Sequence, residues 1–91
     1  MAYSVSTTRK FDKCVEKLKK RGLPMEELRA VIIMLMQSGV LPSKYHPHKL
    51  VGNHAGQWEC HIKPDWLLIW EQDDKELKLL MLETGSHSDL F

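Results

Sequence analysis

The sequence is poor in several features that mark special classes of protein. It has two cysteines among 91 residues, so it can form at most one disulfide bond and no disulfide framework. Its longest run of large apolar residues, at positions 31–36, is far shorter than the ~20 residues that span a bilayer, and no apolar signal segment is recognised. Neither charge sign dominates, because the formal net charge is +1. We therefore expect a cytoplasmic protein with two reduced thiols.

The length and the hydrophobic pattern predict a single small α+β domain over residues 1–91. We expect strands near residues 3–6, 57–63, 66–70 and 77–82, with two helices between the first and the second strand. This β-α-α-β-β-β order corresponds to a helical hairpin packed on one face of a mainly antiparallel four-stranded sheet. The other face has no helix left to cover it, so we expect it to be available for a ligand or a partner.

The apolar positions and the capping residues locate the two helices. Thr7 or Thr8 can cap the first helix, and Gly22 ends it. Pro24 suits the start of the second helix, and Gly39 suits its end. Four apolar side chains at helical spacing form the buried stripe of the first helix: Phe11, Cys14, Val15 and Leu18.

One short stretch gathers residues that can move protons or bind an anion. His61, Lys63, Asp65 and Trp66 surround Pro64, which favours a turn between two strands. These side chains are therefore expected at one end of the sheet. A further histidine, His87, follows later in the chain, and histidine can act as acid or base near neutral pH.

Other chemical readings of the sequence have weaker support. Seven of the thirteen Lys and Arg residues lie between positions 9 and 21, which fits either an RNA-binding stripe or a solvated helix face. The loop at residues 40–56 holds His46 and His54, which we interpret as ordinary polar loop residues. A zinc site built from the histidines and Cys60 does not match a compact ligand pattern. Cys60 also faces away from His61 on a strand, so a nucleophilic Cys–His pair is poorly supported.

Three segments together resemble a known family. Residues 48–52 (HKLVG), 61–70 (HIKPDWLLIW) and 84–91 (TGSHSDLF) are similar to the YafQ branch of the RelE-type toxins, which are ribosome-dependent mRNA interferases of bacterial type II toxin–antitoxin systems. The resemblance extends over essentially the whole chain. It implies a RelE-like fold and a metal-independent endoribonuclease that cuts mRNA in the ribosomal A site, without a cofactor. In this chemistry, the ribose 2′-hydroxyl attacks the adjacent phosphate.

The resemblance also implies residue roles and partners. The implied catalytic residues are His48, His61, Asp65 and His87. The residues expected to bind or support the substrate are Lys49, Lys63, Trp66 and Phe91. We favour His87 as general acid and place Asp65 with His61 on the base side, although the sequence leaves this split open. The implied partners are a cognate antitoxin, the ribosome with its mRNA, and operator DNA only through the toxin–antitoxin complex.

One residue departs from the family pattern, in which an arginine precedes the Thr-Gly of the last motif. This chain has Glu83 there, so either that carboxylate points away from the substrate, or other lysines supply the charge, or cleavage is slow. Two alternative functions remain at this level. One is a non-catalytic toxin of the gyrase-poisoning type on the same scaffold, and the other is a small RNA-binding protein that uses the basic segment.

Overall fold

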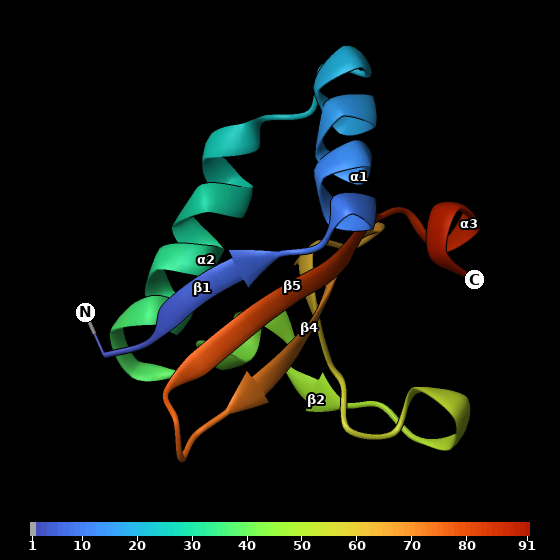
Figure 1. The fold of residues 1–91 in the computed structure, drawn as a ribbon. Helices are drawn as coiled ribbons and strands as arrows, with labels where there is room; N and C mark the ends of the chain where they lie inside the picture. Colours follow the sequence, from blue (N-terminus) through green and yellow to red (C-terminus); the bar gives the residue numbers. More distant parts are fainter. Residues whose placement is uncertain (1) are drawn as a thin grey trace.

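The computed structural model describes residues 2–91, which form one mixed sheet with helices beside it (Figure 1). The strand order is β1-β5-β4-β3-β2, with β1 parallel to β5 and the other neighbours antiparallel. The strands are β1 (Ser4–Thr7), β2 (His48–Lys49), β3 (Trp58–Lys63), β4 (Trp66–Asp73) and β5 (Lys78–Gly85). The helices are α1 (Arg9–Lys20), α2 (Met25–Ser38) and α3 (His87–Leu90), with short 3-10 turns η1 (Ser43–Tyr45) and η2 (Gly52–His54).

The predicted α+β class and element order are confirmed, but the prediction of four strands is wrong. The fifth strand, β2, consists of two residues inside the long loop that pair with β3. Its register places His48 opposite Glu59 and Lys49 opposite Trp58. A two-residue strand carries no periodic pattern, so the sequence could not indicate it.

The helix ends follow the capping chemistry of the sequence. The Thr8 hydroxyl accepts a hydrogen bond from the Phe11 amide, and it donates one to the Leu82 carbonyl of β5. This cap therefore also fixes the start of α1 against the sheet. Gly39 ends α2 in the left-handed conformation, and a side chain there would collide with the Tyr3 ring.

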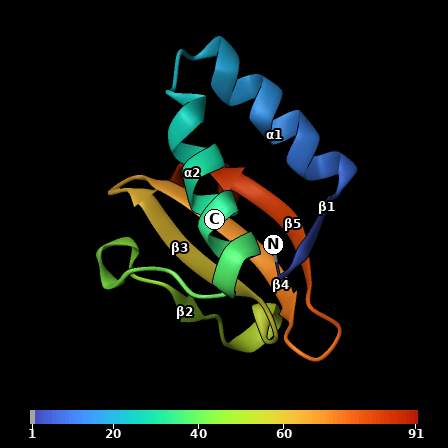
Figure 2. The same ribbon diagram turned by 90° about the vertical axis from the view of Figure 1, so that its left-hand side faces the viewer.

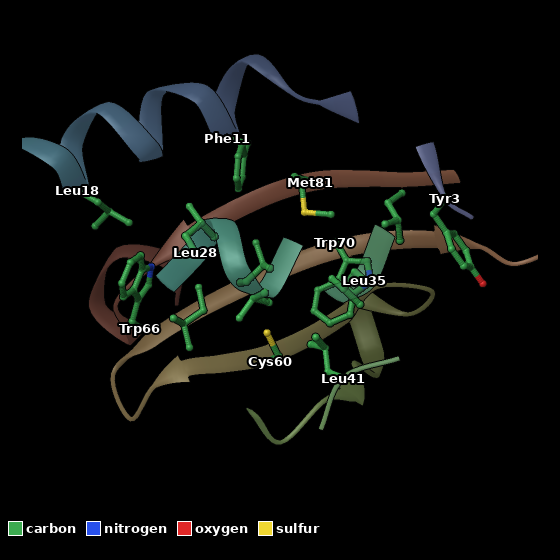
Figure 3. Close-up of a cluster of buried hydrophobic side chains, with 14 residues drawn as sticks. Tyr3, Phe11, Leu18, Leu28, Leu35, Leu41, Cys60, Trp66, Trp70 and Met81 are labelled. Carbon is green, nitrogen blue, oxygen red and sulfur yellow. The ribbon is translucent and has the colours of Figure 1, made fainter. Parts of the chain in front are cut away.

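The hydrophobic core lies between the helical hairpin and one face of the sheet (Figures 2 and 3). Leu18 and Leu35 from the two helices meet Cys60, Leu68 and Trp70 from the central strands, and all five side chains are fully buried. Each such side chain contributes roughly 1.5–3 kcal/mol by leaving water. The core therefore holds β3 and β4 rigidly, and the turn between them carries the candidate site.

The opposite face of the sheet is also largely apolar at its centre. Leu67 and Ile69 point away from the main core, yet both are buried. α3 borders this face on the side away from α2 (Figure 1). The ring of Phe91, which follows α3, lies edge-on 5.7 Å from the ring of His54 in η2. The face predicted to have no helix over it is thus flanked by a very short one.

The helices of the described residues 2–91 include none that is both long and apolar enough to cross a bilayer.

Candidate active site

The turn between β3 and β4 presents His61 and Asp65 at one end of the sheet. The pairing of the two strands is irregular between His61 and Lys63, and such bulges re-aim side chains at the end of a ladder. His61 Nδ1 lies 3.3 Å from the carbonyl oxygen of Pro64, which can accept a hydrogen bond from it. The turn thus orients the histidine ring through its own backbone.

His87 and Asp65 form the best-defined pair in the site. His87 Nδ1 lies 2.7 Å from Asp65 Oδ1, and the His87 backbone amide donates to the same oxygen at 3.0 Å. These two hydrogen bonds, led by the one from the amide, lower the pKa of Asp65 below its usual value. The ionised carboxylate accepts a hydrogen bond from Nδ1–H, so the proton that His87 can exchange is carried on Nε2.

The three-dimensional arrangement brings His87 next to His61. Their ring centroids are 5.9 Å apart, although the residues are far apart in sequence. Both side chains are partly exposed, so a substrate can approach either ring. Two proton-carrying groups at this separation can act on the two sides of a single reacting centre.

The position of His87 depends on a latch between α1 and α3. The guanidinium of Arg21 donates two hydrogen bonds to Asp89, at 2.8 and 2.9 Å. The same carboxylate accepts from the Ser86 amide, while the Ser86 hydroxyl accepts from the Asp89 amide, forming a capping box. The bidentate pair with Arg21 is the main reason that the pKa of Asp89 falls well below its usual range.

We expect Arg21→Gln to loosen α3 at neutral pH, because it removes both hydrogen bonds to Asp89. The Asp89 carboxylate has a lowered pKa in the folded state, so its contribution is present above its unfolded pKa of about 3.9. That contribution disappears as the pH falls through the lower folded value. NMR order parameters of the α3 amides should therefore separate wild type from Arg21→Gln at pH 7 and converge in strong acid. Lys20→Gln, which removes a neighbouring charge without touching Asp89, should behave as wild type, and unchanged α3 order in Arg21→Gln would contradict the latch.

Glu59 is a site residue that the sequence did not single out. The residue is only 7% exposed, and its carboxylate lies 3.2 Å from His48 Nε2 and 3.8 Å from His61 Nε2. The other nitrogen of His48 lies 2.9 Å from the His46 carbonyl oxygen. Because both neighbours of the His48 ring are acceptors, only a doubly protonated ring can donate to both. Glu59 thus joins two predicted histidines, and its place on the polar face of β3 was the available signal.

His46 was interpreted as an ordinary loop residue, but the structure places it beside the site. Its ring meets that of His61 edge-on, with centroids 5.9 Å apart. The two rings line a surface hollow of about 600 Å³ together with Lys44, Lys63 and Pro64. His46 adopts a left-handed backbone conformation at the end of η1, and a sequence pattern gives no indication of such a turn.

The structure gives different surroundings to two residues that were expected to bind or support the substrate. Lys49 lies on the face of the sheet opposite to its neighbour His48, and its ammonium sits 5.5 Å from the ring centre of Trp58. Adjacent strand residues point to opposite faces, so Lys49 is directed away from the histidines. Trp66 is only 2% exposed, and its indole N–H donates to the Thr84 hydroxyl at 3.0 Å. This burial favours the supporting role for Trp66 over direct contact with the substrate.

The remaining predicted residues lie at the rim of the site. Lys63 borders the hollow, but its ammonium pairs with Glu27 of α2 at 3.0 Å. Phe91 is 61% exposed and rests against His54. Glu83 lies opposite Ile69 in the register of β4 and β5, so it points to the sheet face away from the core. Its carboxylate lies 2.9 Å from the ammonium of Lys10. That ion pair neutralises the carboxylate of Glu83, the residue that departs from the family pattern.

The structure also bears on two alternatives considered for the sequence, a nucleophilic Cys60 and a metal site. Cys60 is fully buried on the core face, and burial raises the pKa of its thiol to about 12. It is therefore a core residue and not a nucleophile. Within residues 2–91, the structure contains no cluster of three or more His, Cys, Asp or Glu residues arranged to hold a metal ion.

Comparisons with known proteins place this geometry in a family. Residues 3–91 match the family model described as the bacterial toxin of type II toxin–antitoxin systems, YafQ. The chain is 34% identical over 82 residues to the mRNA interferase toxin YafQ of Escherichia coli K12, covering 89% of this chain and 87% of that protein. Its structure is similar to the crystal structure of YafQ from E. coli BL21(DE3), with a TM-score of 0.90, 30% identity and 98% of each chain covered. It is also similar to a chain in the E. coli DinJ–YafQ complex, with a TM-score of 0.88, 31% identity and 98% of each chain covered. The chain belongs to the YafQ family of toxins from bacterial type II toxin–antitoxin systems.

Proposed function

We propose that this protein is a toxin that acts as an endoribonuclease on mRNA in the A site of the ribosome. The observation that carries the proposal is the hydrogen-bonded His87–Asp65 pair, which lies beside His61 on an accessible face of the sheet. RNA cleavage by its own 2′-hydroxyl needs a general base, a general acid and charge stabilisation at the phosphate. The relative from E. coli K12 is named an mRNA interferase, which supports the same activity here.

In the proposed mechanism, the 2′-oxygen attacks the adjacent phosphorus while the bond from phosphorus to the 5′-oxygen breaks. The products are a 2′,3′-cyclic phosphate and a free 5′-hydroxyl. His87 gives its Nε2 proton to the leaving 5′-oxygen, and Asp65 holds the ring through Nδ1. His61 takes the 2′-hydroxyl proton, with Glu59 rather than Asp65 as its nearest carboxylate. His48 shares Glu59 and completes the catalytic group, and no step requires a metal or a cofactor.

The other parts of the proposal concern partners and location. The DinJ–YafQ complex joins a relative of this chain to another protein, which supports a cognate antitoxin as the partner here. The ribosome and its mRNA are the proposed target, and operator DNA is contacted only within the toxin–antitoxin complex. An mRNA interferase works where translation takes place, so we place the protein in the cytoplasm, with residues 1–91 as one toxin domain.

The test of this function is inducible expression of the wild type and of a His61→Gln/His87→Gln double variant, followed by primer extension on a reporter mRNA. We expect growth arrest and cuts in phase with the codons for the wild type, and neither effect for the double variant. Arrest by both proteins with intact mRNA would overturn the ribonuclease proposal. A gyrase supercoiling assay on the same purified proteins would then test the alternative, a gyrase-poisoning toxin on the same scaffold.

A further inference from the structure

The groove between α1 and α3 carries positive charge beside the catalytic residues. It has a volume of about 300 Å³, and three lysines of α1 line it together with residues of α3 and β5. The lysines are Lys10, Lys13 and Lys17. Their spacing of three and four positions places them on one side of the helix, one above another. The basic segment of the sequence thus contributes a row of cations that faces α3.

The charges inside the groove do not cancel. Lys10 is paired with Glu83, and Asp89 is neutralised by the two hydrogen bonds from Arg21. Within the described residues 2–91, Lys13 and Lys17 have no carboxylate in ion-pair range. Two unneutralised cations therefore remain, on a wall whose apolar part comes from Leu18 and Leu90.

The groove is lined by residues close in the chain to His87. Asp89 and Leu90 of α3, the helix that begins at His87, line it, and so does Thr84 of β5, three residues before His87. A polymer whose scissile phosphate lies at His87 must leave the site along the surface nearby. Evenly spaced lysines match the regularly spaced phosphates of a nucleic-acid strand, which is bound largely through such charges.

We propose that this groove binds the RNA backbone beside the scissile phosphate, with Lys13 and Lys17 each contacting one phosphate. The inference rests on the proposed ribonuclease function and adds a binding subsite that none of the catalytic residues provides. Lys10 also lines the groove, and Glu83 holds its ammonium in place. The apolar wall lies against the ribose edges of the strand.

The test compares two double variants that each remove two positive charges from α1. Lys13→Gln/Lys17→Gln alters the groove, whereas Lys19→Gln/Lys20→Gln alters exposed positions of the same helix outside it. Both are made in a His87→Gln background, and binding of a fluorescent single-stranded RNA is measured across a salt series. For the groove variant we expect a salt slope smaller by about 1.4 and, at 0.1 M salt, affinity weaker on the order of 20-fold, because each lost phosphate contact removes about 0.7 from the slope.

A kinetic measurement with otherwise native protein separates binding from chemistry. On programmed ribosomes, Lys13→Gln/Lys17→Gln should raise KM about tenfold with kcat nearly unchanged, while the outer pair leaves both near wild type. Equal losses of RNA affinity in the two double variants would assign the effect to net charge and overturn the proposed role of the groove. Unchanged RNA binding with weakened antitoxin binding would make the groove a protein-docking surface and also overturn it. If the wild type does not cut mRNA, the ribonuclease proposal fails, and the salt series still decides whether the groove binds RNA.

Discussion

Replacing His87 by glutamine should slow mRNA cleavage on the ribosome by a factor of ~10²–10⁴, the usual contribution of a positioned acid or base. Glutamine can still donate a hydrogen bond to Asp65, so the contact that now spans 2.7 Å can be kept. It has no proton to give to the leaving 5′-oxygen. The effect should therefore appear in kcat, with KM and antitoxin binding close to wild type. Single-turnover cleavage of a ribosome-bound mRNA measures it directly.

The matched control for this experiment is His54→Gln. His54 also contacts the C-terminal region, through the ring of Phe91, but it lies outside the histidine–carboxylate group. We expect its cleavage rate to change by no more than a few-fold. A His87→Gln protein that cleaves within threefold of wild type would exclude His87 as the acid, and Asp65→Asn would then show whether the carboxylate acts alone.

The second large effect concerns stability. Trp66→Ala should lower the free energy of unfolding by ~3–5 kcal/mol, because it empties a large, fully buried site between the helices and the sheet. Small domains have a total stability of only ~5–15 kcal/mol, so this variant is expected to be partly unfolded at 37 °C. Urea unfolding followed by far-UV circular dichroism gives the value.

The variant Trp66→Phe distinguishes a supporting role of Trp66 from direct contact of its indole with the substrate. It keeps most of the buried ring but removes the indole N–H, which leaves the Thr84 hydroxyl with its bond to the Leu67 carbonyl only. We expect a loss of ~1–3 kcal/mol in stability and a cleavage rate within a few-fold of wild type at a temperature where the protein is folded. Thr84→Val, which leaves the buried indole N–H unpaired, should cost a similar amount. A hundredfold loss of kcat/KM in Trp66→Phe with unchanged stability would show instead that the indole touches the RNA.

The sequence was informative wherever a regular pattern or a strong local signal existed. In the apolar stripe of α1, Phe11 and Leu18 are buried as predicted while Cys14 and Val15 are half-buried, and Gly39 ends α2. Pro64 marks the turn that carries His61 and Asp65. These features depend on residues close together in the chain, where periodicity and turn chemistry apply.

The site was harder to predict because its contacts join distant segments. Asp65 pairs with His87, 22 positions later, although the sequence favoured grouping Asp65 with His61. Glu59 lies near His61 on its own strand, but its contact with His48 arises because β2 brings His48 opposite it. His48 and Lys49 point to opposite faces of the sheet because they are neighbours in β2, a strand too short to be recognised from the sequence. The helix α3 does have a local signal in the sequence, the Ser86-to-Asp89 capping box.

The parallel pairing of β1 with β5 has a consequence for synthesis of the protein. Thr8 near the start of the chain bonds to Leu82, 74 positions later, and Ser4 lies opposite Lys78 in the ladder. Until the ribosome has added β5, the growing polypeptide lacks the strand that lies between β1 and β4. Contacts of such long range form late and slow the folding of a small domain. The nuclease therefore folds only when its translation is nearly complete, so the nascent chain is not itself an active toxin during elongation.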